Sequence, residues 1–437
     1  MISYRDAAPI FAALRDDLRP AEFRGKRAAA IESAWPDWVA NRYAAIRQRV
    51  TAGDDESIVY LLLFGTSFTS APRITSRELA ALALTSDAVV PSLTVRVEAL
   101  LTATAGPRTP RMAERLGVVD DVLARARVYP VDARTKQKAR QYLETRARTV
   151  ARESLQRLEA MADRAGGAST IFRDRGLASD TTVSTNFGVD RALAALQTSG
   201  LLRRGSVRRV AIVGPGLDFV DKQFGYDFYP PQTIQPFAVV DSLARSGLAA
   251  TPVAVTTFDV SLRVTAHLTA ARDRARRGVP YTIVLPRNVE QPWAPELLDY
   301  WNILGNTIGA PGRAPAPPEN AGRVEVRAVA IRPAVVTQIA VRDFNVVLER
   351  LETAREADRF DLVIATNVLL YYDVFEQSLA LANISAMLRK GGVLLSNTRL
   401  VEMPGLPMAL AGHTDVTYTR LTGIGDAGDR VFWYVRQ

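Results

Sequence analysis

The feature that most limits the fold of this chain is a change of pattern at Val207. From that residue on, stretches of helical period alternate with short runs rich in β-branched and apolar residues: 207–214, 251–259, 280–286, 324–331, 361–372 and 391–397. Such alternation is typical of a parallel sheet with crossover helices. Two final runs, 416–421 and 430–436, flank a glycine-containing turn and indicate an antiparallel hairpin. We therefore predict an α/β fold whose mostly parallel sheet ends in a carboxyl-terminal antiparallel hairpin.

The first 165 residues have a different pattern, because strand-like alternation is scarce and apolar residues recur at helical spacing. Prolines divide this region into segments of helical length: Pro9, Pro20, Pro36, Pro72, Pro91, Pro107, Pro110 and Pro130. The last segment starts near Asp132, a candidate N-cap, and stops at Gly166. We predict an all-α domain over 1–165, a connector over 166–205 and the α/β domain over 206–437.

The amino-acid composition excludes several kinds of catalytic and metal-binding site. The chain has no Cys and only two His, so disulfides, thiolate zinc sites, iron–sulfur clusters, cysteine nucleophiles and three-histidine metal centres are excluded. We expect no metal site and expect the chemistry to come from a bound cofactor. No run of 18 or more apolar residues occurs, and the first residues lack the layout of a signal peptide. We expect a cytoplasmic protein without a membrane partner.

The chain is basic, with a formal net charge of +9, and only five of its 55 basic residues are Lys. Basic residues gather between Arg134 and Arg152 on one predicted helix. A phosphate-contacting face and an ordinary solvated face are both possible interpretations of this cluster. No aromatic interleaving supports stacking on bases, so we favour the solvated face over a nucleic-acid partner.

The strongest local signal follows the first predicted strand, where an apolar run leads into Gly214-Pro-Gly216-Leu-Asp218. Glycines let the backbone turn tightly and approach a ligand closely. A dinucleotide-binding loop usually has a third glycine, which would fall near position 219, where this chain has Phe219. An ordinary turn that binds no ligand could contain the same two glycines. The next predicted strand ends in Asp259, whose carboxylate can accept from both hydroxyls of a ribose or cap the following helix.

The most specific segment is 360–397, FDLVIATNVLLYYDVFEQSLALANISAMLRKGGVLLSN. It contains an apolar strand, a polar tip at Thr366-Asn367, an amphipathic helix, and Lys-Gly-Gly before another strand. This segment resembles the carboxyl half of the class I S-adenosylmethionine-dependent methyltransferases, with some likeness to the chemotaxis-receptor methyltransferase branch. The resemblance covers about 206–437 and implies a Rossmann-like sheet that binds S-adenosyl-L-methionine.

The same resemblance implies a set of cofactor-binding residues. Gly214 and Gly216, with Asp218 in the same loop, fall beside the methionine portion, and Asp259 falls on the ribose carboxylate of the family. Asp343-Phe344 is similar to the pair that contacts adenine, and Asn367 corresponds to the tip near the sulfonium.

The chain also departs from the family pattern. Ile212 stands where the family often has an acidic residue, and Gly214 and Asp259 are further apart than the usual 20 or so positions. One insertion follows the glycine loop, and a second precedes 324–331, so that 280–286 and 324–331 compete as the third strand. Both insertions carry aromatic and polar residues that could form an acceptor pocket or pack on the domain surface: Tyr226, Asp227, Tyr229, Gln232, Trp293, Tyr300, Trp301 and Asn302.

The function that this resemblance implies is methyl transfer from S-adenosylmethionine to a small or medium organic molecule or a protein side chain. The sulfonium of S-adenosylmethionine is already an activated electrophile, so the reaction does not require a catalytic side chain that is recognisable in the sequence. Weak candidates for a base are Asp227, Tyr226 and His413, whereas His267 is interpreted as structural. Two alternatives stay open: a degenerate methyltransferase fold that acts as a docking protein through its helical half, and an NAD-dependent oxidoreductase, which Phe219 disfavours.

Overall fold

The computed structural model describes residues 1–85, 90–162, 176–177, 181–221, 224–352, 355–420 and 427–437. Its main feature is a seven-stranded sheet with the order β6-β2-β1-β7-β8-β10-β9. The strands are β1 (Val207–Val213), β2 (Ala249–Asp259), β6 (Ile339–Asp343), β7 (Phe360–Ile364), β8 (Leu388–Ser396), β9 (Met408–Thr419) and β10 (Ala427–Arg436). The first five run parallel, and β10 pairs antiparallel with both β8 and β9. The predicted α/β fold with its carboxyl-terminal hairpin is confirmed.

The sheet is buried on both faces, which explains the continuous apolar runs in the sequence. Along β1, Val210 and Ile212 enter the core on one face, whereas Ala211 and Val213 enter the core on the other. The first face is covered by α8 (Val183–Thr198), α9 (Gln235–Arg245), α10 (Leu262–Arg276), α11 (Pro295–Ile303) and α12 (Pro333–Thr337). The second face is covered by α13 (Val374–Met387).

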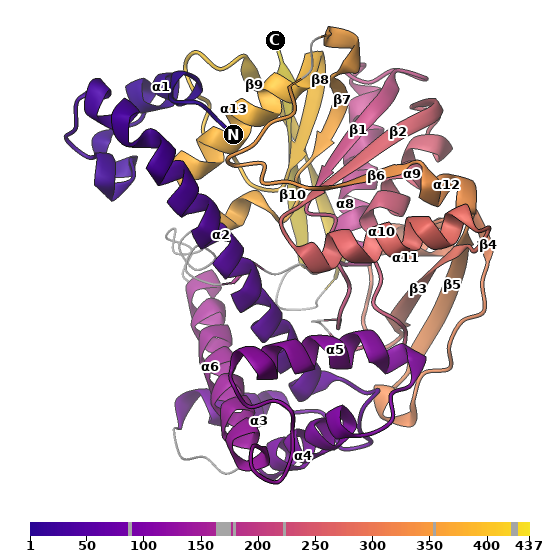
Figure 1. The fold of residues 1–437 in the computed structure, drawn as a ribbon. Coiled ribbons are helices and arrows are strands. Elements are labelled where there is room, and N and C mark those ends of the chain that lie inside the picture. The colour runs from indigo at the N-terminus through magenta and orange to yellow at the C-terminus, as the bar shows by residue number, and fades with distance from the viewer. Residues whose placement is uncertain (86–89, 163–175, 178–180, 222–223, 353–354, 421–426) are drawn as a thin grey trace.

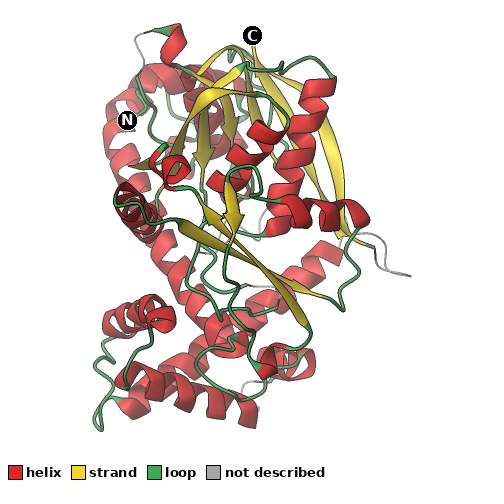
Figure 2. Cartoon of the chain, turned by 90° about the vertical axis from the view of Figure 1, so that its right-hand side faces the viewer, coloured by secondary structure: helices red, strands yellow, loops and turns green. Residues whose placement is uncertain are grey.

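The third strand of the main sheet is β6, so both candidates for this strand, 280–286 and 324–331, are wrong. They belong to β3 (Tyr281–Asn288) and β5 (Val324–Ile331), which form a separate antiparallel sheet with β4 (Gly309–Pro311). The strand β6 has only five residues, and exposed or half-buried side chains dominate it. Its apolar signal is therefore weaker than that of its competitors. Figure 2 shows the small sheet below the main one, toward the lower helices.

The helical part comprises α1 (Tyr4–Ala13), α2 (Ala28–Phe64), α3 (Ser76–Leu84), α4 (Pro91–Ala105), α5 (Pro110–Arg125) and α6 (Lys136–Ala162), with short 3-10 turns at Asp16–Leu18 and Ala21–Phe23. Pro9 and Pro36 lie inside α1 and α2, so these two prolines do not divide helices as the sequence suggested. Packing, not the proline positions, decides where these helices end.

The helix α2 has 37 residues and connects two separate cores (Figure 1). Its first half packs with α1 against α13 and the main sheet, through Ile31, Trp35 and Trp38. Its second half, from Ile58 on, belongs to a core formed by α3 to α6. The two halves of α2 therefore pack in different parts of the molecule.

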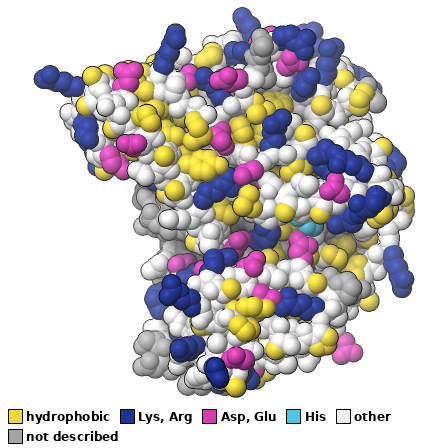
Figure 3. All heavy atoms as spheres, in the orientation of Figure 1, with side chains coloured by type: hydrophobic (Ala, Val, Ile, Leu, Met, Phe, Trp, Pro, Cys, Tyr) yellow, Lys and Arg dark blue, Asp and Glu magenta, His cyan; other side chains and the backbone are white. Residues whose placement is uncertain are grey.

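The distribution of basic residues bears on the choice between a phosphate-contacting face and a solvated one. On the face shown in Figure 3, Lys and Arg side chains are spread over the upper and lower parts and lie among Asp and Glu. On α6, Lys136 pairs with Glu98 at 2.9 Å, and Arg140 pairs with the same carboxylate. Among the described helices, none is both long enough and apolar enough to cross a bilayer.

Candidate functional site

A cavity lies at the carboxyl ends of β1, β2 and β7. It is lined by Val50, Leu177, Gly214, Gly216, Asp259, Val260, Ser261, Thr366, Asn367, Val368, Tyr371 and Tyr372. The chain leaves β1 toward β2 and β6 on one side and later returns to place β7 on the other side. Such a switch point opens a crevice between neighbouring strand ends, where open α/β sheets bind ligands. The cavity thus brings together Gly214, Gly216, Asp259 and Asn367 from the predicted cofactor set.

The glycine loop needs its glycines for conformation and for space. Gly214 has a φ of 63° and Gly216 a φ of 73°, a region that side chains with a Cβ rarely adopt. A Cβ on Gly214 would lie 2.5 Å from the Cγ2 of Val368. The loop is held in place by Gly214 N, which donates to Phe258 O at 2.8 Å, and by Thr233 Oγ1, which donates to Gly216 O at 2.7 Å. Its backbone therefore approaches the cavity closely.

Asp259 ends β2 as a buried carboxylate, with a relative exposure of 8%. Its Oδ1 accepts from Ser261 N at 2.7 Å. Burial raises the pKa of Asp259 to about 7, although hydrogen bonds from the backbone and the charge of Arg263 oppose this shift. The side chain that caps α10 is Ser261, so Asp259 is not needed as the N-cap of that helix. A buried carboxylate lining a cavity is suited to hydroxyl donors of a ligand.

The tip after β7 is fixed by contacts from three other segments. Asn367 has a φ of 59°, and its N donates to Asn397 Oδ1 at 2.7 Å. Its Nδ2 donates to Thr185 Oγ1 at 3.1 Å, and Thr366 Oγ1 accepts from Gln235 Nε2 at 3.0 Å. Left-handed backbone at a non-glycine residue is uncommon and clusters at functional sites.

The helix α2 contributes to the cover of this cavity, a role that the sequence leaves possible for the amino-terminal helices without any motif to mark it. Val50 lines it from the middle of α2, and Leu177 lies beside α2 because its N donates to Arg49 O at 2.8 Å. Arg49 Nη2 donates to Tyr371 O at 2.7 Å, and the guanidinium lies 5.7 Å from the ring centre of Tyr372. Nothing in the local pattern of a long helix marks these residues as site residues.

The predicted adenine pair lies next to the cavity without lining it. Asp343 is opposite Asp259 in the register of β6 and β2, and its carboxylate accepts from Arg47 of α2. The Phe344 ring is buried and stacked on Phe258 at 4.3 Å between ring centres. Asp218 also lies outside this cavity: its Oδ2 accepts from Gln232 Nε2 at 2.9 Å, and the residue lines a different cavity.

The three candidate bases are placed away from the cavity. Asp227 is fully buried, and one carboxylate oxygen accepts from Thr66 N at 2.6 Å and from Ser67 N at 3.0 Å, which fixes the chain after α2. Tyr226 is buried beneath Arg73, and burial raises its pKa to about 12. His413 lies on the outermost strand, opposite Phe432.

The two insertions are mostly packed inside the molecule. Tyr229, Tyr300 and Trp301 are buried in hydrophobic cores, and Gln232 exchanges hydrogen bonds with the backbone of Val284 at 2.7 Å. His267 lies between Tyr281 at 2.9 Å and Glu114 at 3.1 Å, a setting that fits its structural interpretation.

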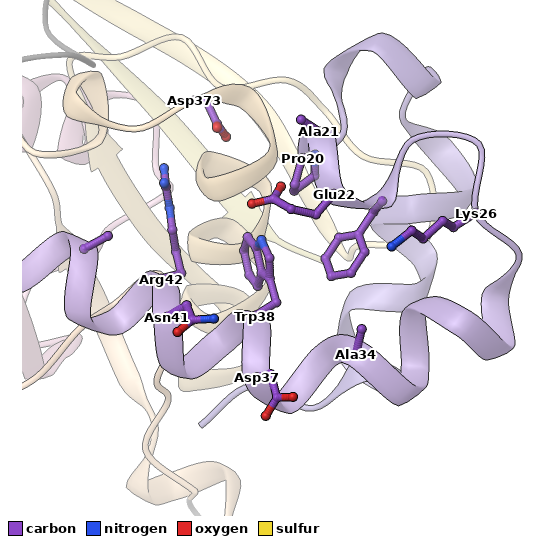
Figure 4. Close-up of a pocket in the computed structure, with 12 residues that line it drawn as sticks. Pro20, Ala21, Glu22, Lys26, Ala34, Asp37, Trp38, Asn41, Arg42 and Asp373 are labelled. Atoms are coloured by element: carbon purple, nitrogen blue, oxygen red, sulfur yellow. The ribbon is translucent and has the colours of Figure 1, made fainter.

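A larger cavity of about 520 Å³ lies between the turn at Ala21–Phe23, α2 and the start of α13 (Figure 4). Trp38 and Arg42 project into it from α2, whereas Asp37 points away. Arg42 Nε donates to Glu376 at 2.6 Å, and Asp373 caps α13. These polar groups join α2 to α13. None of the residues that line this larger cavity belongs to the carboxyl ends of the strands.

No protein-family model matches this sequence, and no curated protein matches it. Solved structures of methyltransferases overlap with it in part. The N-methyltransferase NodS from Bradyrhizobium japonicum WM9 is 13% identical over 58% of this chain and 96% of its own, with a TM-score of 0.28. Magnesium protoporphyrin IX methyltransferase from Synechocystis PCC 6803, which holds S-adenosylmethionine, is 14% identical over 65% and 97%, with a TM-score of 0.28. The glycopeptide N-methyltransferase MtfA, also complexed with S-adenosylmethionine, is 11% identical over 56% and 77%, with a TM-score of 0.23. Likenesses at TM-scores this low do not assign an activity to the chain.

Proposed function

We propose that this chain is an S-adenosylmethionine-dependent methyltransferase. The observation that carries the proposal is that the glycine loop, the buried carboxylate of Asp259 and the tip at Asn367 line one cavity at the switch point of the sheet. These are the residues that the resemblance of 206–437 assigns to the cofactor. Their clustering from three different strand ends supports that assignment.

The residues present fit most of this cofactor. Asp259 offers a buried acceptor for the ribose hydroxyls, and Gly214 leaves no room for a Cβ beside Val368. The adenine end fits less well, because Arg47 holds Asp343 and the Phe344 ring is in the core. Because Arg47 occupies Oδ1 of Asp343, only the other carboxylate oxygen is available to the adenine amine.

The bound cofactor supplies a methyl group on a positively charged sulfur. The part of the protein is then to hold and orient the reactants and to exclude water. Asp259 would hold the sugar and the glycine loop would hold the methionine portion. Val50 and Leu177 close the cavity from the side of α2. We propose a small or medium organic molecule, or a protein side chain, as the acceptor. Because the Asp227 carboxylate already accepts hydrogen bonds from Thr66 and Ser67, we do not propose it as the base.

Calorimetric titration with S-adenosylhomocysteine tests this function. The wild type is expected to bind it and not NADH, and Asp259→Asn is expected to bind it at least tenfold more weakly. Asp241→Asn is a matched control, because Asp241 is also buried but accepts from Thr307 N at 3.0 Å, away from the cavity.

Failure of the wild type to bind S-adenosylhomocysteine would overturn the proposal, and binding of NADH instead would support the oxidoreductase. If the wild type and Asp259→Asn bind S-adenosylhomocysteine equally, the assignment of Asp259 to the ribose hydroxyls is wrong. Cofactor binding without turnover on any acceptor would favour a docking protein.

A further inference from the structure

The tip at Asn367 is held by a residue that follows the neighbouring strand. Asn397 comes directly after Ser396, the last residue of β8, which pairs in parallel with β7. Asn367 N donates to Asn397 Oδ1 at 2.7 Å, and Asn397 Nδ2 donates in return to Asn367 Oδ1. Both ends of the Asn397 carboxamide are therefore used to join the carboxyl ends of two adjacent strands.

The backbone conformation of Asn367 depends on such a partner. Its φ of 59° lies in the left-handed region, which residues other than glycine adopt rarely. Backbone of this kind persists where the surrounding structure fixes it from several sides. Asn397 binds the backbone N and the side-chain oxygen of Asn367, and Thr185 Oγ1 accepts from Asn367 Nδ2 at 3.1 Å. The direction of the tip is thus set by contacts from β8 and α8.

Asp429, on β10, in turn fixes the orientation of Asn397. Its Oδ2 accepts from Asn397 Nδ2 at 3.3 Å, and its Oδ1 accepts from Arg430 N at 3.0 Å. An ionised carboxylate only accepts hydrogen bonds, and an amide nitrogen only donates them. Rotation of the Asn397 carboxamide by half a turn would therefore bring its oxygen against the carboxylate and its nitrogen against Asn367 N. Asp429 selects the orientation that holds the tip.

The order of the strands places this tip at the reactive end of the proposed cofactor. With the ribose at Asp259 on β2, the neighbouring strand β6 is on one side, and the glycine loop after β1 and then β7 are on the other. Asp343 at the end of β6 is held by Arg47, so the methionine portion with its sulfur extends along the glycine loop toward Asn367. A displacement of about 1 Å in a reacting group can lower a rate on the order of a hundredfold.

We propose that Asn397, oriented by Asp429, is a positioning residue for methyl transfer. It holds Asn367 in the left-handed conformation and thereby sets where the methyl-bearing sulfur lies. The proposal rests on the proposed function, since it concerns the cofactor of the same site. Asn397 lies behind the tip and does not line the cavity, so it acts through Asn367.

S-Adenosylmethionine labelled with carbon-13 in its methyl group tests the inference, because the methyl signal in a proton–carbon NMR spectrum reports the surroundings of that group. Asn397→Ala is expected to move the signal of the bound methyl by more than its linewidth. Its affinity for S-adenosylhomocysteine is expected to stay close to that of the wild type, because Asp259 and the glycine loop are unchanged. Asn320→Ala is the matched control, since Asn320 is also half-buried but donates to Thr69 O at 3.0 Å, away from the cavity.

Two variants of Asp429 separate positioning from a general loss of structure. Asp429→Ala is expected to move the methyl signal in the same direction as Asn397→Ala but by less. Asp429→Asn keeps an oxygen that can accept from Asn397 Nδ2, so it is expected to restore the wild-type signal. This pair decides the matter if Asn397→Ala does not fold, and equal signals from the two Asp429 variants would then overturn the inference.

The positioning role and the proposed function fail in different ways. A wild-type methyl signal in Asn397→Ala, or an equal displacement in Asn320→Ala, would overturn the positioning role and leave the methyltransferase proposal standing. If the wild type binds no S-adenosylmethionine, the proposed function is wrong and the positioning role is wrong with it.

Discussion

Arg47, in the middle of α2, donates a hydrogen bond to Asp343 at the end of β6, a residue 296 positions later in the sequence. The same guanidinium donates to Val260 O, so it lies beside the strand end that carries Asp259. One side chain of the helical part therefore ties α2 to the edge of the proposed cofactor site. The first prediction concerns this contact.

Replacing Arg47 with Gln is expected to strengthen binding of S-adenosylhomocysteine about threefold, because both carboxylate oxygens of Asp343, instead of one, become available to the adenine amine. The free energy of unfolding is expected to fall by only about 0.5–1 kcal/mol, since both side chains are partly exposed. Calorimetric titration and urea unfolding measure the two effects. Arg15→Gln, at an exposed ion pair, is the control. Weaker binding by Arg47→Gln would mean that Arg47 contributes to the nucleotide site instead of blocking it.

Gly214→Ala tests whether the glycine loop needs space as well as conformation. The new Cβ would meet Val368 at 2.5 Å, so we expect at least tenfold weaker binding of S-adenosylhomocysteine. The expected loss of stability is about 1–3 kcal/mol, as for other strained backbone positions. Gly25→Ala is the matched control, because Gly25 has a φ of 67° with no atom within 4 Å of a built Cβ. Equal stability losses in the two variants would show that the contact with Val368 can relax.

Asp227→Asn separates a structural role from a catalytic one. The carboxylate accepts from Thr66 and Ser67 in a fully buried position, so the expected loss of stability is about 2–3 kcal/mol. Titration of the folded variant with S-adenosylhomocysteine is expected to give the wild-type affinity. Asp415→Asn, at an exposed ion pair, is expected to change neither quantity by much. A stable Asp227→Asn variant that has lost only turnover would restore Asp227 as a candidate base.

The raised pKa of Asp259 predicts a dependence on pH. Its value of about 7 in the folded protein exceeds the ordinary value of 3.8, so the folded state binds more protons than the unfolded state between these values. The contribution of Asp259 to stability is therefore present below pH 4 and is lost as the pH rises to 7. Affinity for S-adenosylhomocysteine is expected to change in the opposite direction, on the order of fivefold stronger at pH 8 than at pH 6, because the ionised carboxylate accepts both ribose hydroxyls.

Urea unfolding and calorimetry at pH 5, 6, 7 and 8 measure this dependence. Asp259→Asn is expected to show a shallower loss of stability with rising pH than the wild type, and Asp17→Asn, at an exposed carboxylate, is expected to match the wild type. Identical profiles for Asp259→Asn and the wild type would assign the pH dependence to other groups, of which Asp218 is the first to test because burial also raises its pKa to about 7.

The α/β class, the carboxyl-terminal hairpin and the residues at three strand ends could all be predicted from the amino-acid sequence. This was possible because each of these features is local: an apolar run forms a strand, and the residue after it lies at a known edge of a parallel sheet. Gly214, Asp259 and Asn367 therefore come together in the structure as the order of the strands required.

The identity of the third strand, the cover of the cavity and the contacts of each buried acid became clear only from the folded chain. The strand β6 is short and polar, and its place beside β2 depends on pairing that no local pattern encodes. From the sequence, Arg47 has no distinguishing feature and Asp227 is a weak candidate for a base. In the structure, each contacts a partner far away in the sequence. Hydrogen bonds and ion pairs between distant segments depend on packing, and packing is a property of the whole fold.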